Sequence, residues 1–136
     1  MKELLRNDYL AVTVEDDGLV SLAWHKEEPD DDHSVATAKN VESLLNAYFA
    51  EAEAKKPATI LVDLVCVKKT FPRGTAAYTG WLLSHRGQIR AVAFATKSLL
   101  LRAGVSAALL VPGLKAKGFS DAREAKAFLA GDLLLS

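Results

Sequence analysis

Hydrophobic and polar residues alternate, in part, over residues 9–14 and again over residues 19–24. Alternation with a period of two indicates strands, because successive side chains of a strand point to opposite faces of a sheet. Between the two segments, three acidic residues are followed by Gly18, a combination that is typical of a turn. The pattern therefore predicts a β-hairpin near the start of the chain.

Beyond residue 34 the apolar residues recur every three or four positions as far as residue 52. This spacing places them on one face of a helix, with Ser34 as the expected N-cap and Pro57 as the expected stop. Residues 58–64 then form a nearly continuous apolar run. Such a run predicts a strand that is covered on both faces of a parallel sheet.

The same succession of helix and strand recurs once more. Helical spacing over residues 72–86 is followed by Gly87, which is the expected helix C-cap, and by a second apolar strand over residues 89–95. Two crossover units of this kind predict parallel strands with helices packed against the sheet.

A third helix is predicted to start at Thr96 or Ser98 and to run through residue 110. Its apolar residues lie nearly all round the helix, which is more than one buried face requires. This surplus predicts a deep core, a homodimer surface or a wall that faces a lipid. The candidate residues of this apolar surface are Leu99, Leu100, Leu101, Val105 and Leu109.

The last strand is predicted over residues 114–119, where two lysines that face one way favour an edge position in the sheet. Ser120 is the expected N-cap of a final helix, and Gly131 is its expected end. The complete order is β-β-α-β-α-β-α-β-α. We therefore expect an α/β fold with a mixed, mostly parallel sheet of about five strands.

The composition is that of an ordinary globular protein. The chain has 136 residues, of which 50% are hydrophobic and 25% charged, so we expect one domain over residues 1–136 with its core at about residues 9–130. Seventeen basic and seventeen acidic residues cancel. A neutral domain lacks the long-range attraction to phosphate, so no nucleic-acid partner is expected.

The single cysteine, Cys66, excludes a disulfide within the chain. The first eight residues are too polar for a signal peptide, and no apolar run approaches the roughly 18 residues of a membrane span. These features predict a cytoplasmic protein without a transmembrane segment.

Four features in order resemble a known family. They are the hairpin, the strand that ends in Asp63-Leu64, the strand over residues 90–95 with Lys97-Ser98 behind it, and the ending over residues 119–129. This order resembles the STAS domains of bacterial anti-sigma-factor antagonists, in the SpoIIAA-like branch of small stand-alone proteins. The resemblance implies a non-enzymatic regulatory module that binds another protein, with a role in bacterial signalling.

The resemblance also implies a regulatory surface after the Asp-Leu strand, where signalling members carry a serine or threonine that is phosphorylated. The usual Asp-Ser-Ser-Gly or Asp-Ser-Thr-Gly signature is absent from residues 65–75 of this chain. Thr75 is the nearest equivalent by position, and Thr70 is the second. The predicted regulatory and interaction residues are Lys68, Lys69, Thr70, Arg73, Thr75 and Tyr78.

The cationic residues Lys68, Lys69 and Arg73 precede or open the second helix, where free backbone amides and the helix dipole attract anions. An anion site at this helix N-terminus is one interpretation of the cluster. Solvated charges on an exposed loop are the other, and we favour this second interpretation.

Candidate catalytic groups were weighed against structural roles. Cys66 and the three histidines, His25, His33 and His85, could form a thiol-imidazole pair, but a lone cysteine after a buried strand is more often a small apolar filler. Residues 25–33 contain metal-ligand atoms without a zinc or calcium spacing. No glycine-rich nucleotide or hydrolase motif is present. We therefore expect no catalytic residue, no metal and no cofactor.

Two classes of function remain open. One is a protein-interaction module that works through the loop and helix after Asp63-Leu64, as the resemblance implies. The other is a small-ligand or lipid-binding domain, since related folds with the same sheet enclose apolar ligands.

Overall fold

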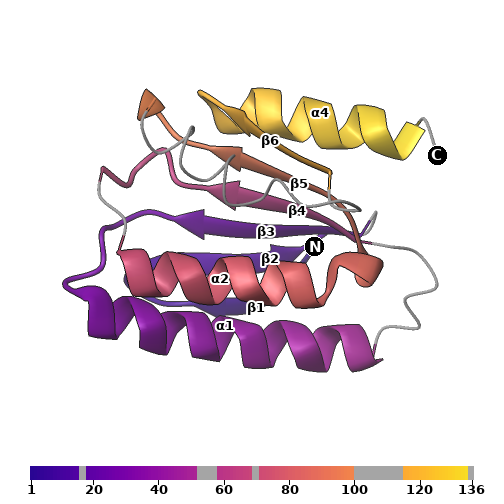
Figure 1. Cartoon of the computed structure of the whole chain (residues 1–136). Coiled ribbons are helices and arrows are strands. Elements are labelled where there is room, and N and C mark those ends of the chain that lie inside the picture. The colour runs from indigo at the N-terminus through magenta and orange to yellow at the C-terminus, as the bar shows by residue number, and fades with distance from the viewer. Residues whose placement is uncertain (16–17, 52–57, 69–70, 100–114, 135–136) are drawn as a thin grey trace.

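A computed structural model describes residues 1–15, 18–51, 58–68, 71–99 and 115–134, and it contains a six-stranded sheet (Figure 1). The spatial order of the strands follows the chain, from β1 at one edge to β6 at the other. The strands are β1 (Lys2–Arg6), β2 (Leu10–Val14), β3 (Leu19–Trp24), β4 (Ala58–Asp63), β5 (Ile89–Ala95) and β6 (Lys115–Phe119).

The sheet is antiparallel on one side and parallel on the other. Strands β1, β2 and β3 pair antiparallel, whereas β3, β4, β5 and β6 pair parallel. In the parallel part, Leu22 is the register partner of Val62, and Val62 is the partner of Phe94. The hairpin, the mixed sheet, the strands near 58–64 and 89–95, and the edge position of β6 are thus confirmed.

Helices α1 (Asp31–Glu51) and α2 (Pro72–Ser84) lie side by side on one face of the sheet, and α4 (Ala122–Leu134) lies on the other (Figure 1). A short 3₁₀ helix, η1 (Arg86–Gln88), leads into β5. Helices α1 and α2 share a face because both belong to crossovers between neighbouring parallel strands, and such crossovers have one hand. No helix within the described part of the chain has the length and apolar character needed to cross a membrane.

Each face of the sheet has its own core. The face toward α1 and α2 carries large side chains, among them Leu22, Ile60 and Phe94. On the face toward α4, β5 presents the alternate alanines Ala91, Ala93 and Ala95, which pack in one cluster with Leu19, Leu61 and Leu129. Successive side chains of β5 point to opposite faces of the sheet, so this strand presents large side chains toward α1 and α2 and alanines toward α4. We call the face toward α4 the shallow face and the opposite one the bulky face.

The expectation of about five strands was one strand short, because β1 was not predicted. Strand β1 reads Lys-Glu-Leu-Leu-Arg, with exposed charged residues at both ends and only Leu4 and Leu5 half-buried against the core. Edge strands commonly carry charges that discourage pairing with other chains, and these charges hide the apolar alternation.

Two expected helix starts were also misplaced. Helix α1 begins at Asp31, and the preceding Asp30 accepts the amide hydrogen of His33 at 2.7 Å, so Ser34 lies inside the helix and is buried. Helix α4 begins after Asp121, whose carboxylate accepts the amide of Glu124 at 2.8 Å. In both places an aspartate accepts the amide three residues ahead, which an N-cap does.

Neither predicted glycine end is correct. Helix α2 ends at Ser84 with His85 as its C-cap, and Gly87 lies within η1. Helix α4 continues through Gly131 to Leu134. Among the described glycines, Gly18 in the hairpin turn has a positive φ, of 88°, which glycine adopts without steric cost.

Other expectations lie outside the described residues. Pro57 and the greater part of the predicted third helix, with Leu100, Leu101, Val105 and Leu109, belong to this group. Leu99 is described, and its side chain is 75% exposed.

Candidate functional site

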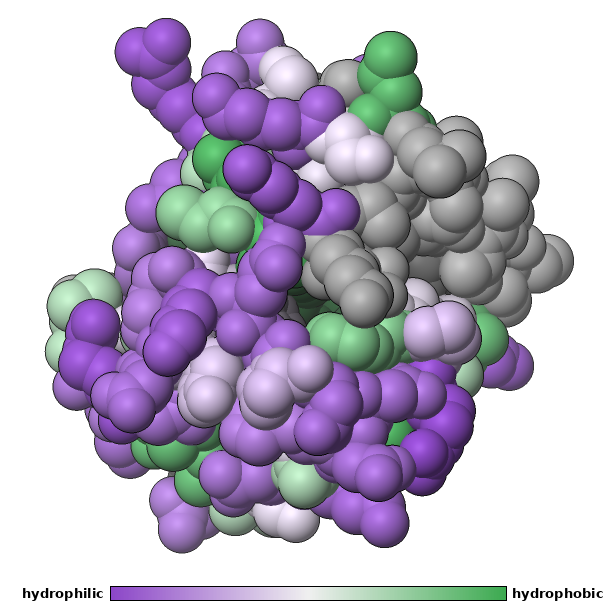
Figure 2. Space-filling view, turned by 90° about the vertical axis from the view of Figure 1, so that its left-hand side faces the viewer, coloured by the Kyte–Doolittle hydropathy of each residue, from purple (hydrophilic) through white to green (hydrophobic). Residues whose placement is uncertain are grey.

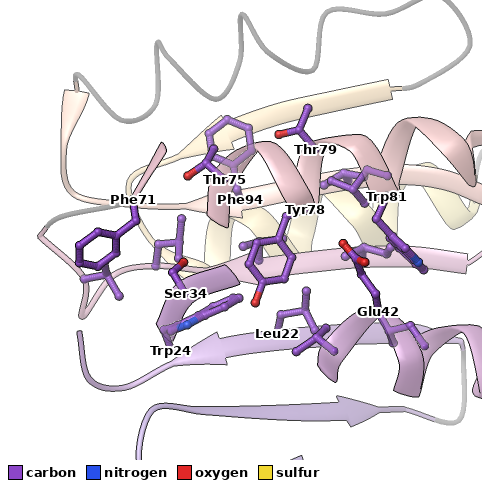
Figure 3. A pocket seen from close by; sticks show the side chains of 18 of the residues that line it. Leu22, Trp24, Ser34, Glu42, Phe71, Thr75, Tyr78, Thr79, Trp81 and Phe94 are labelled. Atoms are coloured by element: carbon purple, nitrogen blue, oxygen red, sulfur yellow. The ribbon is translucent and has the colours of Figure 1, made fainter. Parts of the chain in front are cut away.

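A cavity of about 110 Å³ lies between the sheet and the two helices α1 and α2 (Figure 3). Its floor is the bulky face of the three parallel strands β3, β4 and β5, and its walls are the facing sides of the helices. Most of its lining is apolar. The strand residues that line it are Leu22, Trp24, Ile60, Val62, Val92 and Phe94.

One end of the cavity lies toward the carboxyl edge of the parallel strands. Leu64, Val67 and Phe71, which follow β4, line this end. Figure 2 views the edge and shows hydrophobic surface in a hollow among hydrophilic side chains. Ligands of open α/β sheets bind outside the carboxyl ends of the strands, which makes this location a candidate binding site.

Both tryptophans of the chain line the cavity. The ring of Trp24 meets that of Tyr78 edge-on, with centroids 5.5 Å apart. Trp81 stacks between Phe49 and His85, and its indole N–H donates to Asn46 Oδ1 at 2.9 Å. The two indoles are fixed by these contacts, so their fluorescence reports on what enters the cavity.

Tyr78 brings a polar atom into this apolar lining. Its hydroxyl is buried and has no hydrogen-bond partner among the described residues. Burial raises the pKa of the Tyr78 phenol far above its usual value, and the charges of Glu28 and Glu42 raise it further, so the hydroxyl stays protonated. A buried hydroxyl without a partner costs about 1–3 kcal/mol, which the fold tolerates here.

Glu28 is a second unsatisfied group on the cavity wall. Its side chain is only 6% exposed, and its Oε1 accepts no hydrogen bond from the described part of the chain. His33 Nδ1 lies 3.5 Å from this oxygen without hydrogen-bond geometry. Buried carboxyl groups are normally paired and hydrogen-bonded, so Glu28 and Tyr78 together mark part of the cavity wall as a place for a polar group.

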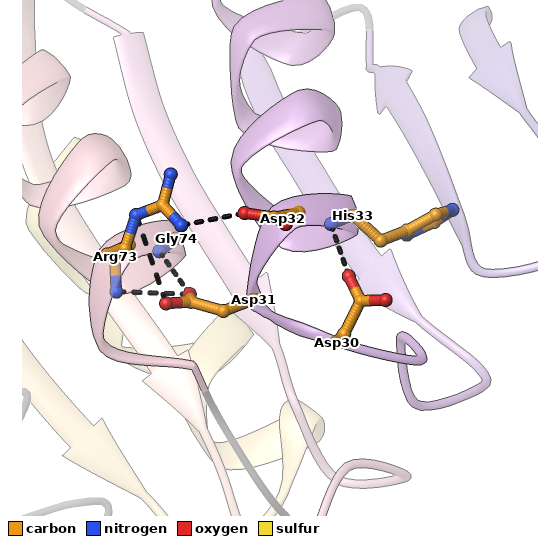
Figure 4. Close-up of polar contacts among 6 residues, drawn as sticks. All are labelled: Asp30, Asp31, Asp32, His33, Arg73 and Gly74. Carbon is orange, nitrogen blue, oxygen red and sulfur yellow. Dashed lines mark hydrogen bonds and ion pairs between the residues drawn. The ribbon is translucent and has the colours of Figure 1, made fainter.

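The start of α2 is held by aspartates from α1 (Figure 4). Asp31 Oδ1 accepts the backbone amides of Arg73 and Gly74 at 3.2 and 3.3 Å, and the Arg73 guanidinium donates to Asp32 Oδ1 at 2.7 Å. The hydrogen bond and charge of Asp32, followed by the charge of Asp31, raise the pKa of Arg73. The amides that could attract an external anion therefore already bind a carboxylate.

Replacing Asp31 with alanine is expected to lower the free energy of unfolding by about 0.5–2 kcal/mol, the usual cost of losing a helix cap. Urea denaturation followed by circular dichroism measures the change. Asp32→Ala is the matched control, because the ion pair between Asp32 and Arg73 is exposed and such pairs contribute little. Equal losses in both variants would show that Asp31 does not act as the cap.

Comparison with known proteins identifies the fold. No protein-family model matches the chain, and no curated protein matches its sequence. The structure is similar to the crystal structure of an uncharacterized protein of the DUF3478 family with a SpoIIAA-like fold from Shewanella loihica PV-4. The similarity has a TM-score of 0.55 at 19% sequence identity, and it covers 92% of this chain and 98% of the other. The fold is SpoIIAA-like.

The SpoIIAA-like fold distributes the predicted regulatory residues over two environments. Lys68 and Arg73 are exposed, although the Lys68 amide donates to Glu27 Oε1 at 2.6 Å. Thr75 and Tyr78 are half-buried and line the cavity. Lys69 and Thr70 lie outside the described residues. Helix α2 therefore contributes both to the surface that the resemblance predicts and to the wall of the cavity.

Two of the histidines have backbone contacts in this SpoIIAA-like fold. His25 Nε2 lies 3.0 Å from the carbonyl of Asn7, and His85 Nδ1 lies 2.9 Å from that of Trp81. Cys66 is exposed, so its expected role as a small apolar filler is wrong. In the described ranges, no three histidine, cysteine or acidic side chains are grouped as metal ligands are.

Two cavity residues, Glu28 and Glu42, were not predicted from the sequence. Glu42 did carry a signal, because it lies four residues after Ala38 and three before Leu45, on the apolar face of α1. An acidic residue on the buried face of a helix indicates that a polar group has a role inside the core. Glu28 carried no such signal, because it lies in a loop between β3 and α1.

Proposed function

We propose that the protein is a single non-catalytic binding domain that takes a small apolar molecule into the cavity between the sheet and helices α1 and α2. The observation that carries the proposal is an apolar cavity of about 110 Å³ whose wall holds a buried, unpartnered tyrosine hydroxyl. In another protein, an engineered apolar cavity of about 150 Å³ binds benzene, so a space of this order suits a ring or a short alkyl chain.

The positions of the histidines support a non-catalytic role. A general base must lie within hydrogen-bond reach of the bound molecule, and none of His25, His33 and His85 is among the residues that line the cavity. The exposed Cys66 lies after β4 and is not among the cavity residues. The proposed role is therefore binding, in the cytoplasm as the sequence predicts.

Benzene is expected to bind and to change the tryptophan fluorescence in a saturable way, because Trp24 and Trp81 both line the cavity. The variant Val62→Phe places a ring in the same space and should abolish the saturable change while the protein stays folded. Ala23→Val is the matched control, since Ala23 lies on β3 between the cavity residues Leu22 and Trp24 and points to the opposite face. A response that survives in Val62→Phe would refute the proposal.

A second candidate is the regulatory protein-interaction role that the SpoIIAA-like fold suggests. It is supported by the exposed side chains of Lys68 and Arg73, which flank the cavity residue Phe71 in the sequence. The experiment compares the partner proteins recovered by wild type, Arg73→Ala and Thr75→Glu. Identical recovery by all three would exclude this surface, and light scattering would show whether a second copy is the partner.

A further inference from the structure

We infer that the ligand of this cavity is a small amine, whose apolar body fills the cavity and whose ammonium group lies beside Glu28, Glu42 and Tyr78. This inference rests on the proposed function and specifies its ligand class.

The three polar residues come from three separate segments of the chain. Glu28 lies before α1, Glu42 lies on α1, and Tyr78 lies on α2, yet all three line the same cavity. Figure 3 shows the Tyr78 hydroxyl and the Glu42 carboxylate pointing into the space between the two helices. The convergence is therefore a product of tertiary structure, and it places two acidic side chains near the Tyr78 hydroxyl in a largely apolar site.

The hydrogen-bonding capacity of these residues matches a donor. Ionised carboxylates only accept hydrogen bonds, and the oxygen of a tyrosine hydroxyl accepts as well as donates. Glu28 Oε1 and the Tyr78 hydroxyl have no hydrogen-bond partner in the described ranges, so both lack what an ammonium group supplies with its three N–H donors. His33 Nδ1 lies 3.5 Å from Glu28 Oε1, within ion-pair distance for a protonated imidazole, but makes no hydrogen bond with it.

The charges of the residues that line the cavity also favour a cation. The lining residues within the described part of the chain include two acidic side chains and no lysine or arginine. A carboxylate or phosphate on the ligand would face Glu28 and Glu42 in a partly desolvated site, which is repulsive.

The test uses three six-carbon probes that differ only in their polar end: hexylamine, 1-hexanol and hexanoate. Hexylamine carries a positive charge at neutral pH, as a lysine side chain does. We expect hexylamine to bind about tenfold more tightly than hexanoate, as one additional charge-assisted hydrogen bond predicts, with 1-hexanol between them. Titration calorimetry and tryptophan fluorescence on the full chain measure the three affinities, with benzene as the probe that has no polar end.

Variants separate the polar residues from the apolar cavity. Glu28→Gln and Tyr78→Phe should each weaken hexylamine several-fold and leave benzene unchanged, whereas Glu51→Gln, an exposed charge on α1, should change neither. Equal or tighter binding of hexanoate, or unchanged hexylamine affinity in both variants, overturns the inference while benzene binding still supports the proposed function. If benzene does not bind either, the proposed function and the inference both fail.

Discussion

Leu129→Ala is expected to lower the free energy of unfolding by about 3–5 kcal/mol, in the upper part of the range for such substitutions. Leu129 is 1% exposed and packs with α4 against the shallow face of the sheet. The other buried residues of its cluster are four alanines, Ala91, Ala93, Ala95 and Ala125, together with Leu19 and Leu61. The alanine side chains are too short to move into the space, so much of the cavity created by the substitution is expected to remain.

Denaturation in urea, followed by tryptophan fluorescence and circular dichroism, measures this loss. Lys126→Ala is the matched control on the same helix, one turn earlier. The ammonium of Lys126 lies 3.6 Å from Glu15 Oε1, and both side chains are partly exposed, so this pair is expected to contribute little. Comparable losses in the two variants would contradict the prediction that burial of Leu129 stabilises α4 on the sheet far more than the ion pair of Lys126 does.

Gly74→Ala is expected to lower the free energy of unfolding by about 1–3 kcal/mol, as overpacking of a close contact does. A Cβ atom at position 74 would lie 2.8 Å from Ser34 Cβ and would overlap Ser34 Oγ. The close approach of α1 and α2 at this point therefore requires glycine, although Gly74 lies in the first turn of a helix where alanine is otherwise preferred.

Gly80→Ala is the control for Gly74→Ala, because both glycines belong to α2 and a Cβ at position 80 meets no atom within 4 Å. It should raise the stability by about 0.5–1 kcal/mol through helix propensity alone. Ser34→Gly, combined with Gly74→Ala, should recover most of the loss by removing the overlapping side chain. Thermal melts of the four proteins test the contact, and failure of Ser34→Gly to rescue Gly74→Ala would contradict it.

The elements predicted correctly are those whose burial is periodic along the chain. The apolar run of β4 and the alternation in β2 and β3 reflect contacts that repeat every residue or every second residue, so a short window contains the signal. Strand β1 was not predicted because charged residues flank its two leucines and no periodic pattern is visible. The start of α1 was misplaced because Asp30 and Ser34 are both good N-cap residues, and their hydrogen bonds decide between them.

The candidate site was less accessible to sequence reasoning, because its features arise between segments far apart in the chain. Asp31 caps a helix that starts 41 residues later, at Pro72. The burial of Glu28 and the isolation of the Tyr78 hydroxyl depend on how α1 and α2 meet over the sheet. The family resemblance directed attention to Thr75 and Tyr78, but it assigned them to a surface, whereas both line a cavity.

The two faces of the sheet are expected to differ in compressibility. The described residues enclose a cavity of about 110 Å³ under α1 and α2, while α4 packs on the face that carries Ala91, Ala93 and Ala95. Hydrostatic pressure favours whichever state has the smaller total volume, and internal voids are the main volume that a folded protein can give up. Compression therefore acts on the helix pair before it acts on α4, and a molecule that fills the cavity makes the two layers respond alike.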